Sequence, residues 1–109
     1  TSTPLNDAAE SAAIEACFGE HAAKLKVSST KSMTGHMLGA AGAFEAIISL
    51  LALNEGMVPP TIGLEEEDEV CRLNFVKGKA QALDCEYALS NSLGFGGHNS
   101  CLVLKRGGR

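Results

Sequence analysis

The residue of this sequence best suited to chemistry is a histidine in a glycine-bounded loop. His36 follows Gly35 and precedes Gly39, at the end of a polar stretch, residues 28–36, that is rich in Ser and Thr. The stretch leads into an apolar segment with the composition of a buried helix. Backbone N–H groups at a helix start favour negative charge nearby, and a neutral imidazole there can donate a hydrogen bond to an oxygen on which charge develops. His36 is therefore a candidate donor to a reacting oxygen.

Two charged residues accompany His36. Lys31 lies five residues before it and could supply a fixed positive charge that opposes its protonation. Glu45 lies inside the apolar segment, where a buried carboxylate costs several kcal/mol unless it is paired or well hydrogen-bonded. Lys31 is the nearest cation in sequence that could pair with it. Two simpler interpretations stay open: an incidental His on a surface loop, and a Glu45 that finds an exposed strip of the helix.

A second glycine-rich stretch surrounds Phe95. Gly94 and Gly96, on either side of it, permit backbone angles that other residues avoid and leave the ring free to move. Such a turn can point a backbone N–H at a substrate oxygen; the simpler alternative is a tight hairpin with a packed Phe. Neither glycine stretch is a nucleotide motif, because a strand rather than a helix follows Phe95 and no Lys stands where a P-loop requires it.

The apolar pattern predicts the elements that position these residues. We expect a helix over residues 6–18, with Asn6-Asp7 as its N-cap, and a strongly apolar helix over residues 39–54, closed by Gly56. Because the second helix is apolar on nearly every side, we expect it to be buried. A loop is expected at residues 28–36, and extended segments at residues 25–28, 58–64, 73–76, 86–90 and 101–104. This order indicates an α/β fold with a mixed sheet.

Composition and charge exclude several classes of protein. The chain has 109 residues, a formal net charge of −4 and 45% hydrophobic residues, which fits a globular domain and argues against nucleic-acid binding. We interpret the acidic run at residues 65–69 as a solvated loop rather than a metal site. The four cysteines form no C-x-x-C pair or zinc pattern, so we expect reduced thiols in a cytosol-like compartment. The apolar run over residues 38–53 contains two Gly and one Glu, and we judge it too short and too polar to span a bilayer.

Three stretches, in this order, resemble the β-ketoacyl-acyl-carrier-protein synthases of the elongating type. Residues 31–42, K-S-M-T-G-H-M-L-G-A-A-G, match the family's K-S-x-x-G-H-x-x-G-A-A-G. Residues 91–99, N-S-L-G-F-G-G-H-N, resemble its N-S-F-G-F-G-G-x-N, and residues 1–7 resemble the tail of H-[GA]-T-S-T-x-x-x-D. The resemblance covers essentially the whole chain, up to about Arg106, and three motifs at the correct spacing make it specific.

The resemblance implies a thiolase-like fold of two similar α/β halves. Residues 1–109 would be a C-terminal ketosynthase domain, a fragment of the larger two-half enzyme, in which a mixed sheet packs against a buried central helix. The family's reaction is a decarboxylative Claisen condensation in fatty-acid or polyketide synthesis. An acyl group moves from acyl carrier protein to a cysteine, malonyl-acyl carrier protein is decarboxylated, and the resulting carbanion attacks the acyl thioester.

The same resemblance assigns roles to individual residues. His36 would be the second catalytic histidine, which donates to the malonyl thioester oxygen as it becomes an enolate. Lys31 would tune it, and Glu45 would be the buried carboxylate of the same network. Phe95, between its two glycines, would be the gating phenylalanine, whose backbone N–H completes an oxyanion hole with the nucleophilic cysteine. Thr1 and Thr3 would provide the hydroxyls that hold phosphopantetheine. Some members of the family also hold a monovalent cation, which here would lie near Glu45, Ser90 and Asn91.

Several features depart from the family's pattern. None of the four cysteines lies in the D-T-A-C-like context of the family's nucleophile, and the other catalytic histidine would lie two residues before Thr1. Leu93 stands where Phe is usual, and His98 where Thr or Ser is found more often. The first residue is Thr rather than Met, which suggests a chain that was cut, processed or incomplete. Since no acyl-enzyme forms without its thiolate, we expect this chain alone to be inactive.

The resemblance also implies partners and a setting. We expect acyl carrier protein, the N-terminal half of the same enzyme and a second copy in a homodimer, with no nucleic acid and no membrane. No resident cofactor is expected, since phosphopantetheine arrives on acyl carrier protein, and the compartment would be the cytoplasm or an organelle stroma or matrix. A polyketide ketosynthase, a thiolase piece and a catalytically silent fragment stay open as alternatives. The sequence does not give the acyl chain-length preference, the carrier-protein docking patch or the dimer surface.

Overall fold

The computed structural model describes residues 1–64 and 73–107, which fall into two compact units. The first unit comprises Thr1–Gly35 and Pro59–Ala80, and the second comprises His36–Val58 and Gln81–Arg109. The acidic run at residues 65–69, interpreted as a solvated loop, lies outside the described residues, as does one of the four cysteines, Cys71.

The first unit opens with helix α1, Pro4–Phe18, which starts earlier than predicted. Thr3 is its N-cap and Pro4 its first residue, whereas Asn6-Asp7 had been expected as the cap. Proline fits this position because its fixed φ suits the first turn and its missing N–H would have no helical partner there. The helix ends at Gly19, whose φ is 55°, and a 3-10 segment, Gly19–Lys24, follows.

The prediction of a loop over residues 28–36 is wrong in one respect, because it contains a one-turn helix, α2, Lys31–Thr34. The carbonyl of Thr30 accepts the N–H groups of Met33 and Thr34 at 2.9 and 3.0 Å. Hydroxyl groups then hold this turn to the segment near Thr61: the Ser29 N–H donates to the Thr61 hydroxyl, and the Ser32 hydroxyl accepts the Ile62 N–H, both at 2.9 Å. Side-chain hydroxyls of this kind compete with regular backbone pairing, which is why composition alone suggested a loop.

Three extended segments lie side by side in the first unit. Val27 is bridged to Phe75 and Thr61 to Lys77, both in parallel orientation. Val76, fully buried between them, donates its N–H to the Val27 carbonyl at 2.9 Å, and its own carbonyl accepts the Thr61 N–H at 2.8 Å. Each of the predicted extended segments 25–28, 58–64 and 73–76 thus contains a bridged residue, but the bridges are isolated, and residues 62 and 63 form a turn rather than the predicted extended chain.

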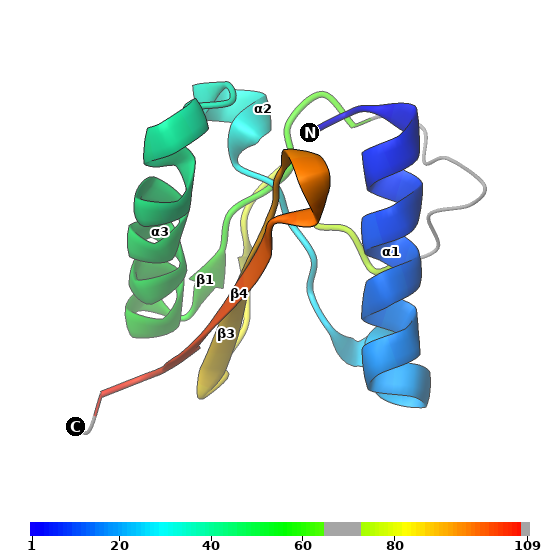
Figure 1. Ribbon diagram of the computed structural model, residues 1–109. Helices are drawn as coiled ribbons and strands as arrows, with labels where there is room; N and C mark the ends of the chain where they lie inside the picture. The colour runs from blue at the N-terminus through cyan, green and yellow to red at the C-terminus, as the bar shows by residue number, and fades with distance from the viewer. Residues whose placement is uncertain (65–72, 108–109) are drawn as a thin grey trace. The chain divides into compact units, whose positions relative to one another are not determined.

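The second unit is a helix beside a β-hairpin (Figure 1). A 3-10 turn, Leu38–Ala40, leads into α3, Ala41–Glu55, which ends at Gly56 in the left-handed region. Strand β3, Tyr87–Leu93, pairs antiparallel with β4, Asn99–Lys105, from Tyr87↔Lys105 to Leu93↔Asn99. A short antiparallel pair joins β1, Met57–Val58, to β2, Gln81–Ala82. These elements confirm the predicted helix over residues 39–54 and both predicted C-terminal strands.

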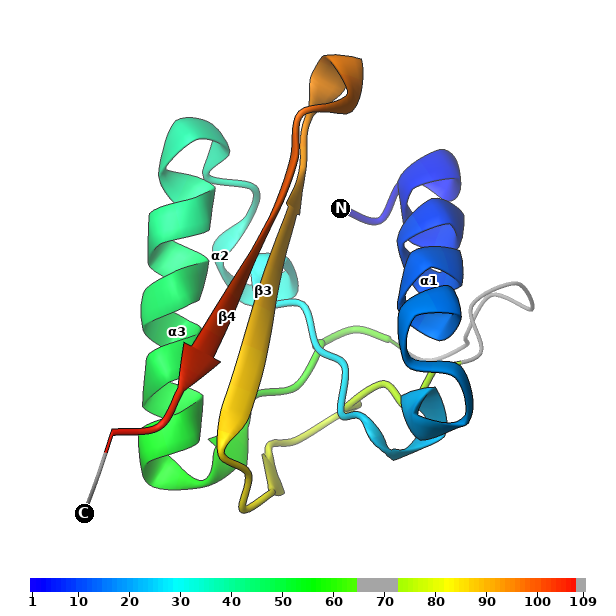
Figure 2. The same ribbon diagram turned by 60° about the horizontal axis from the view of Figure 1, so that its bottom comes forward.

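Parallel and antiparallel pairing together give the predicted mixed α/β character, but the predicted burial of α3 needs correction. The helix packs on β3 and β4 (Figure 2), and it buries Ala41 and Leu53, while Ile47, Leu50 and Leu51 stay about half exposed. A hairpin can cover only one side of a helix, whereas the apolar residues of α3 lie on nearly all sides. Within the described residues, this helix is therefore covered on one side.

The exclusion of a membrane span on length and polarity was too strong. The helical segment Leu38–Glu55 has 18 residues and a mean hydropathy of 1.3, so by length and composition it could cross a membrane. A core helix of a soluble α/β protein has the same pattern. Composition therefore does not separate these two settings.

Candidate active site

One close approach in the second unit brings the candidate residues of that unit to one end. A Cβ added to Gly42, in the first turn of α3, would lie 3.7 Å from the hydroxyl oxygen of Ser92, near the end of β3. His36 lies just before that end of the helix, Glu45 less than one turn beyond Gly42, and Phe95 just after that end of the strand. An added Cβ at this distance would make only an ordinary van der Waals contact, so the distance places helix and hairpin together without showing that glycine is required there.

The imidazole of His36 has a defined tautomer. Its Nδ1 accepts the backbone N–H of Leu38 at 3.0 Å. A backbone N–H can only donate, so Nδ1 carries no proton, and in the neutral imidazole the proton is on Nε2. His36 is exposed. The arrangement therefore offers an Nε2–H donor on an imidazole whose other nitrogen is already held.

Leu38, which holds His36, has an unusual backbone. Its φ is 52°, in the left-handed region, although it is not a glycine. A Cβ in this region costs roughly 1–2 kcal/mol. The Leu38 side chain is 78% exposed, so within this chain its own packing does not explain the conformation. The residue whose N–H holds Nδ1 thus also has a strained backbone angle, and backbone strain of this kind clusters at functional sites.

The hairpin turn around Phe95 is built by contacts of its glycines. The Gly94 N–H donates to the His98 carbonyl at 3.0 Å, and a Cβ at Gly94 would lie only 3.0 Å from the same oxygen. Gly96 and Gly97 have φ values of 76° and 80°, which favour glycine. The Phe95 side chain is fully exposed. The expected hairpin is therefore present, but the simpler alternative of a packed Phe is wrong for the described chain.

Glu45 is half-buried on α3, not fully enclosed as its apolar neighbours had suggested. Its backbone carbonyl accepts the Ser49 hydroxyl at 2.9 Å. On the neighbouring strand β3, Ser90 is buried and Asn91 half-buried. Among the described residues there is no group of three or more His, Cys, Asp or Glu side chains that could hold a metal. A monovalent cation held by oxygens of Glu45, Ser90 and Asn91 stays a prediction.

The other predicted site residues belong to the first unit. Lys31 begins α2, where its carbonyl accepts the Gly35 N–H at 2.8 Å, and its side chain is half-buried. The hydroxyls of Thr1 and Thr3 lie 2.9 Å apart and are both exposed. Two adjacent hydroxyls can share one polar ligand as donor and acceptor, which is what a phosphopantetheine arm would need.

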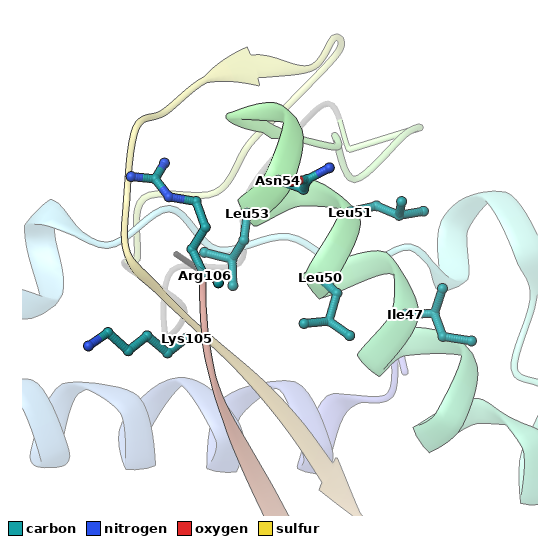
Figure 3. Close-up of a pocket in the computed structure, with 8 residues that line it drawn as sticks. Ile47, Leu50, Leu51, Leu53, Asn54, Lys105 and Arg106 are labelled. Carbon is teal, nitrogen blue, oxygen red and sulfur yellow. The ribbon is translucent and has the colours of Figure 1, made fainter. Parts of the chain in front are cut away.

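An apolar groove that the sequence did not predict lies at the opposite end of the second unit (Figure 3). It has a volume of about 320 Å³ and is lined mainly by aliphatic residues of α3 and by the end of β4. The charged ends of Lys105 and Arg106 point away from the helix side chains (Figure 3). The Lys105 ammonium lies 5.7 Å from the centroid of the Tyr87 ring, and Arg106 is 2.7 Å from the Asp84 carboxylate. The hydrogen bond to Asp84 raises the pKa of Arg106 above its usual value.

This groove is remote from the candidate chemistry. Its lining residues include Lys105, which pairs with Tyr87, whereas Phe95 follows the Leu93↔Asn99 pair at the other end of the hairpin. Six residues of strand separate these ends, which is roughly 20 Å. Because only the pairing of helix and strand creates the groove, periodicity alone could not have indicated it.

The cysteines described by the structure are unpaired thiols. Cys17 and Cys101 are exposed and Cys85 is half-buried. This agrees with the expected reduced state for these three residues. No disulfide or metal centre is available from them to organise the site, so its geometry rests on backbone hydrogen bonds and on the glycines.

Comparison with solved structures gives the class of fold. The ishigamide ketosynthase/chain length factor has a TM-score of 0.93 and 41% sequence identity, covering 99% of this chain and 26% of that chain. A type II polyketide-synthase ketosynthase, solved in complex with its acyl-carrier protein and bound to the hexaketide, has a TM-score of 0.93 and 37% identity, covering 96% of this chain and 26% of that chain. The protein has the thiolase-like fold of these ketosynthases, and the similarity includes the apolar segment 38–55.

Sequence comparison gives the family. The family model described as the C-terminal domain of β-ketoacyl synthase matches residues 1–65. The chain therefore belongs to the β-ketoacyl synthase family. The 3-oxoacyl-[acyl-carrier-protein] synthase 2 of Coxiella burnetii is 58% identical over 106 residues, which are 97% of this chain and 26% of that protein. The chain thus spans about a quarter of the length of the relatives it matches.

Proposed function

We propose that this chain is the C-terminal portion of a 3-oxoacyl-acyl-carrier-protein synthase of fatty-acid elongation. The observation that carries the proposal is the hydrogen bond from the Leu38 N–H to His36 Nδ1. It leaves Nε2–H as a donor at an exposed position, at the end of the second unit where the start of α3 approaches the end of β3 that leads to the Phe95 turn. The match to the β-ketoacyl synthase family supports the same reaction class.

In the proposed reaction, His36 stabilises the charge that decarboxylation creates. The bond between Cα and the carboxylate of malonyl-acyl carrier protein breaks, CO2 leaves, and the electron pair moves through Cα onto the thioester oxygen. The Nε2–H of His36 donates to that oxygen as it becomes an enolate. Cα then attacks the acyl thioester of the enzyme: a C–C bond forms, the C–S bond breaks, and the cysteine leaves as a thiolate. A preorganised donor of this kind contributes most where charge develops.

The remaining residues have supporting roles in this proposal. Lys31 and Glu45 tune His36, the Phe95 N–H contributes to the oxyanion hole for the acyl thioester, and the paired hydroxyls of Thr1 and Thr3 hold phosphopantetheine. A monovalent cation at Glu45, Ser90 and Asn91 belongs to the same proposal. The nucleophilic cysteine would come from a segment with the D-T-A-C-like context, which none of the four cysteines here has. The chain alone would therefore bind and polarise the malonyl thioester, but it would not form the acyl-enzyme.

The proposed partners follow from the reaction. Acyl carrier protein delivers both thioesters, which is supported by the solved ketosynthase in complex with its own acyl-carrier protein. The N-terminal half of the same enzyme would cover the exposed apolar side chains of α3, and a second copy would complete a homodimer. Phosphopantetheine is carried by the substrate, so the enzyme needs no resident cofactor. The compartment would be the cytoplasm, or a stroma or matrix in a eukaryote.

A polyketide ketosynthase is the second candidate. It is favoured by the structural likeness to the type II polyketide ketosynthase, at 37% identity. Identity to the 3-oxoacyl-[acyl-carrier-protein] synthase 2 of Coxiella burnetii is higher, at 58% over nearly the same share of this chain, and this favours fatty-acid elongation. The two are separated by products: one condensation per acyl substrate for fatty-acid elongation, and a poly-β-keto chain for the alternative.

The proposal is tested in the full-length protein that contains this chain. We expect His36→Ala to lower CO2 release from malonyl-acyl carrier protein, and with it condensation, by about 10²–10³-fold, as for loss of one oxyanion donor. The control is His21→Ala, since His21 is an exposed histidine of the 3-10 segment after α1. Undiminished decarboxylation by His36→Ala, with the control active, would refute the role of His36.

A further inference from the structure

His98, an exposed residue, is hydrogen-bonded to one of the glycines that flank Phe95 and lies beside the other. Its carbonyl oxygen accepts the Gly94 N–H at 3.0 Å. Its ring lies against the open face of Gly96: a Cβ added there would be 3.6 Å from Cδ2 and 3.9 Å from Nε2 of the imidazole. The backbone of His98 is thus linked to Gly94, and its side chain lies beside Gly96, so both parts of His98 adjoin the turn that presents Phe95.

This link matters because little else in the described chain holds the Phe95 side chain. That side chain is fully exposed, so its direction depends on the backbone angles of its neighbours. Gly96 has a φ of 76°, and a glycine moves between backbone regions more easily than any other residue. The His98 ring occupies space beside Gly96, within 3.6 Å of the position that a Cβ would take, so it is placed where it would limit movement of this glycine.

We propose that His98 is a positioning residue for the Phe95 gate. Its imidazole, beside Gly96, favours one arrangement of the turn and so sets how readily the Phe95 ring moves to admit an acyl chain. The inference rests on the proposed function, because it presumes that an acyl chain passes Phe95. It assigns the ring a steric role: His98 transfers no proton, and its effect is confined to acyl loading.

The consequence is a separation between the two halves of the reaction. Loading of the acyl chain onto the enzyme depends on motion of the Phe95 ring, whereas decarboxylation depends on the donor His36. Removing the imidazole frees the turn and changes acyl loading, more for a long chain than for a short one. It leaves decarboxylation unchanged, because the Leu38 N–H that holds His36 is on a different segment.

The experiment uses full-length protein with 4-trifluoromethyl-phenylalanine at position 95 and follows its ¹⁹F resonance. In His98→Ala the ring contact is lost while the backbone carbonyl stays, and we expect a narrower resonance from a more mobile ring. The rate of acyl transfer from long-chain acyl-acyl carrier protein should change by about three- to tenfold, the scale of ordering one side chain. His98→Phe keeps a flat ring beside Gly96 and should behave like the parent. Because the proposed role of His98 is steric, the dependence of acyl loading on pH should be the same in His98→Phe as in the parent.

Several results would overturn the proposal. The proposal is refuted if His98→Ala leaves both the ¹⁹F resonance and the rate of acyl loading unchanged. It is also refuted if His98→Ala behaves like the parent while His98→Phe does not. Equal loss of loading and decarboxylation in both His98→Ala and a milder His98→Thr variant would also refute it, because the effect would not be confined to the gate. The ¹⁹F measurement needs no catalysis, so it tests His98 even if His36→Ala shows that the proposed reaction is wrong.

Discussion

Replacing Gly94 with alanine tests most directly how the Phe95 turn is built. Gly94 has φ −114° and ψ 165°, an extended conformation that alanine adopts without strain. The added Cβ, however, would lie 3.0 Å from the His98 carbonyl oxygen, closer than the 3.3–3.6 Å of an ordinary carbon–oxygen contact. Because this oxygen belongs to the backbone and accepts the Gly94 N–H, the turn must open and the hydrogen bond must lengthen.

Two effects of opposite sign set the expected change in the free energy of unfolding. Overpacking a well-packed core costs about 1–3 kcal/mol, and the conflict at the exposed Gly94 should lie at the low end of this range or below it. Alanine also restricts the unfolded chain, which stabilises by about 0.4–1 kcal/mol, so we expect a net loss of at most about 1 kcal/mol. Urea unfolding of the full-length protein should show a lower midpoint at unchanged slope, and acyl transfer should slow because Phe95 is displaced. The matched control is Gly107→Ala, at a glycine with open space around its Cβ position and no positive φ, where the change should stay within about 0.5 kcal/mol. Equal stability and equal acyl transfer in the two variants would refute the contact.

Two further predictions use the same unfolding measurement. Leu53→Ala removes a side chain of α3 that is 2% exposed, and it should lower the free energy of unfolding by about 2–5 kcal/mol. The control Leu5→Ala, at an 88% exposed position, should change it by less than about 0.5 kcal/mol. Similar losses in both variants would contradict the assigned core. Leu38 has a φ of 52°, an angle that favours glycine, so Leu38→Gly should be no less stable than the parent. The β-branched Leu38→Val should lower the free energy of unfolding by about 1 kcal/mol. The reverse order of stability would show that the left-handed conformation of Leu38 is wrong.

Elements with a strong apolar pattern were predictable from the sequence. The helix expected over residues 39–54 is α3, Ala41–Glu55, and the strands expected at residues 86–90 and 101–104 are the paired ends of one hairpin. Their signals are local: a long apolar run closed by glycine, and two β-rich segments separated by a glycine turn. The family resemblance likewise depended on short motifs, and the comparisons confirmed it.

Features that depend on distant residues were not predictable in the same way. The one-turn helix α2 is held by hydroxyls that pair with residues about thirty positions away, and no local pattern reports such partners. The burial of α3 was overestimated because apolar composition says that a helix needs cover, not that the described chain supplies it. The contact of His98 with Gly96 depends on the turn geometry and leaves no trace in periodicity.

The candidate site is shaped by the main chain more than by packed side chains. His36 and Phe95 are both exposed, yet each is fixed through a backbone N–H: that of Leu38 on Nδ1, and that of Gly94 on the His98 carbonyl. A backbone anchor survives most side-chain replacements but not a change in the allowed backbone angles. Substitutions at Leu38, where the allowed backbone angles matter, and at Gly94, where an added Cβ meets the His98 carbonyl oxygen, should therefore disturb the site more than substitutions at exposed apolar neighbours such as Met37. None of these side chains has been assigned a direct chemical role. If Met37→Ala impaired turnover more than Gly94→Ala, side-chain packing rather than backbone geometry would be the determining factor.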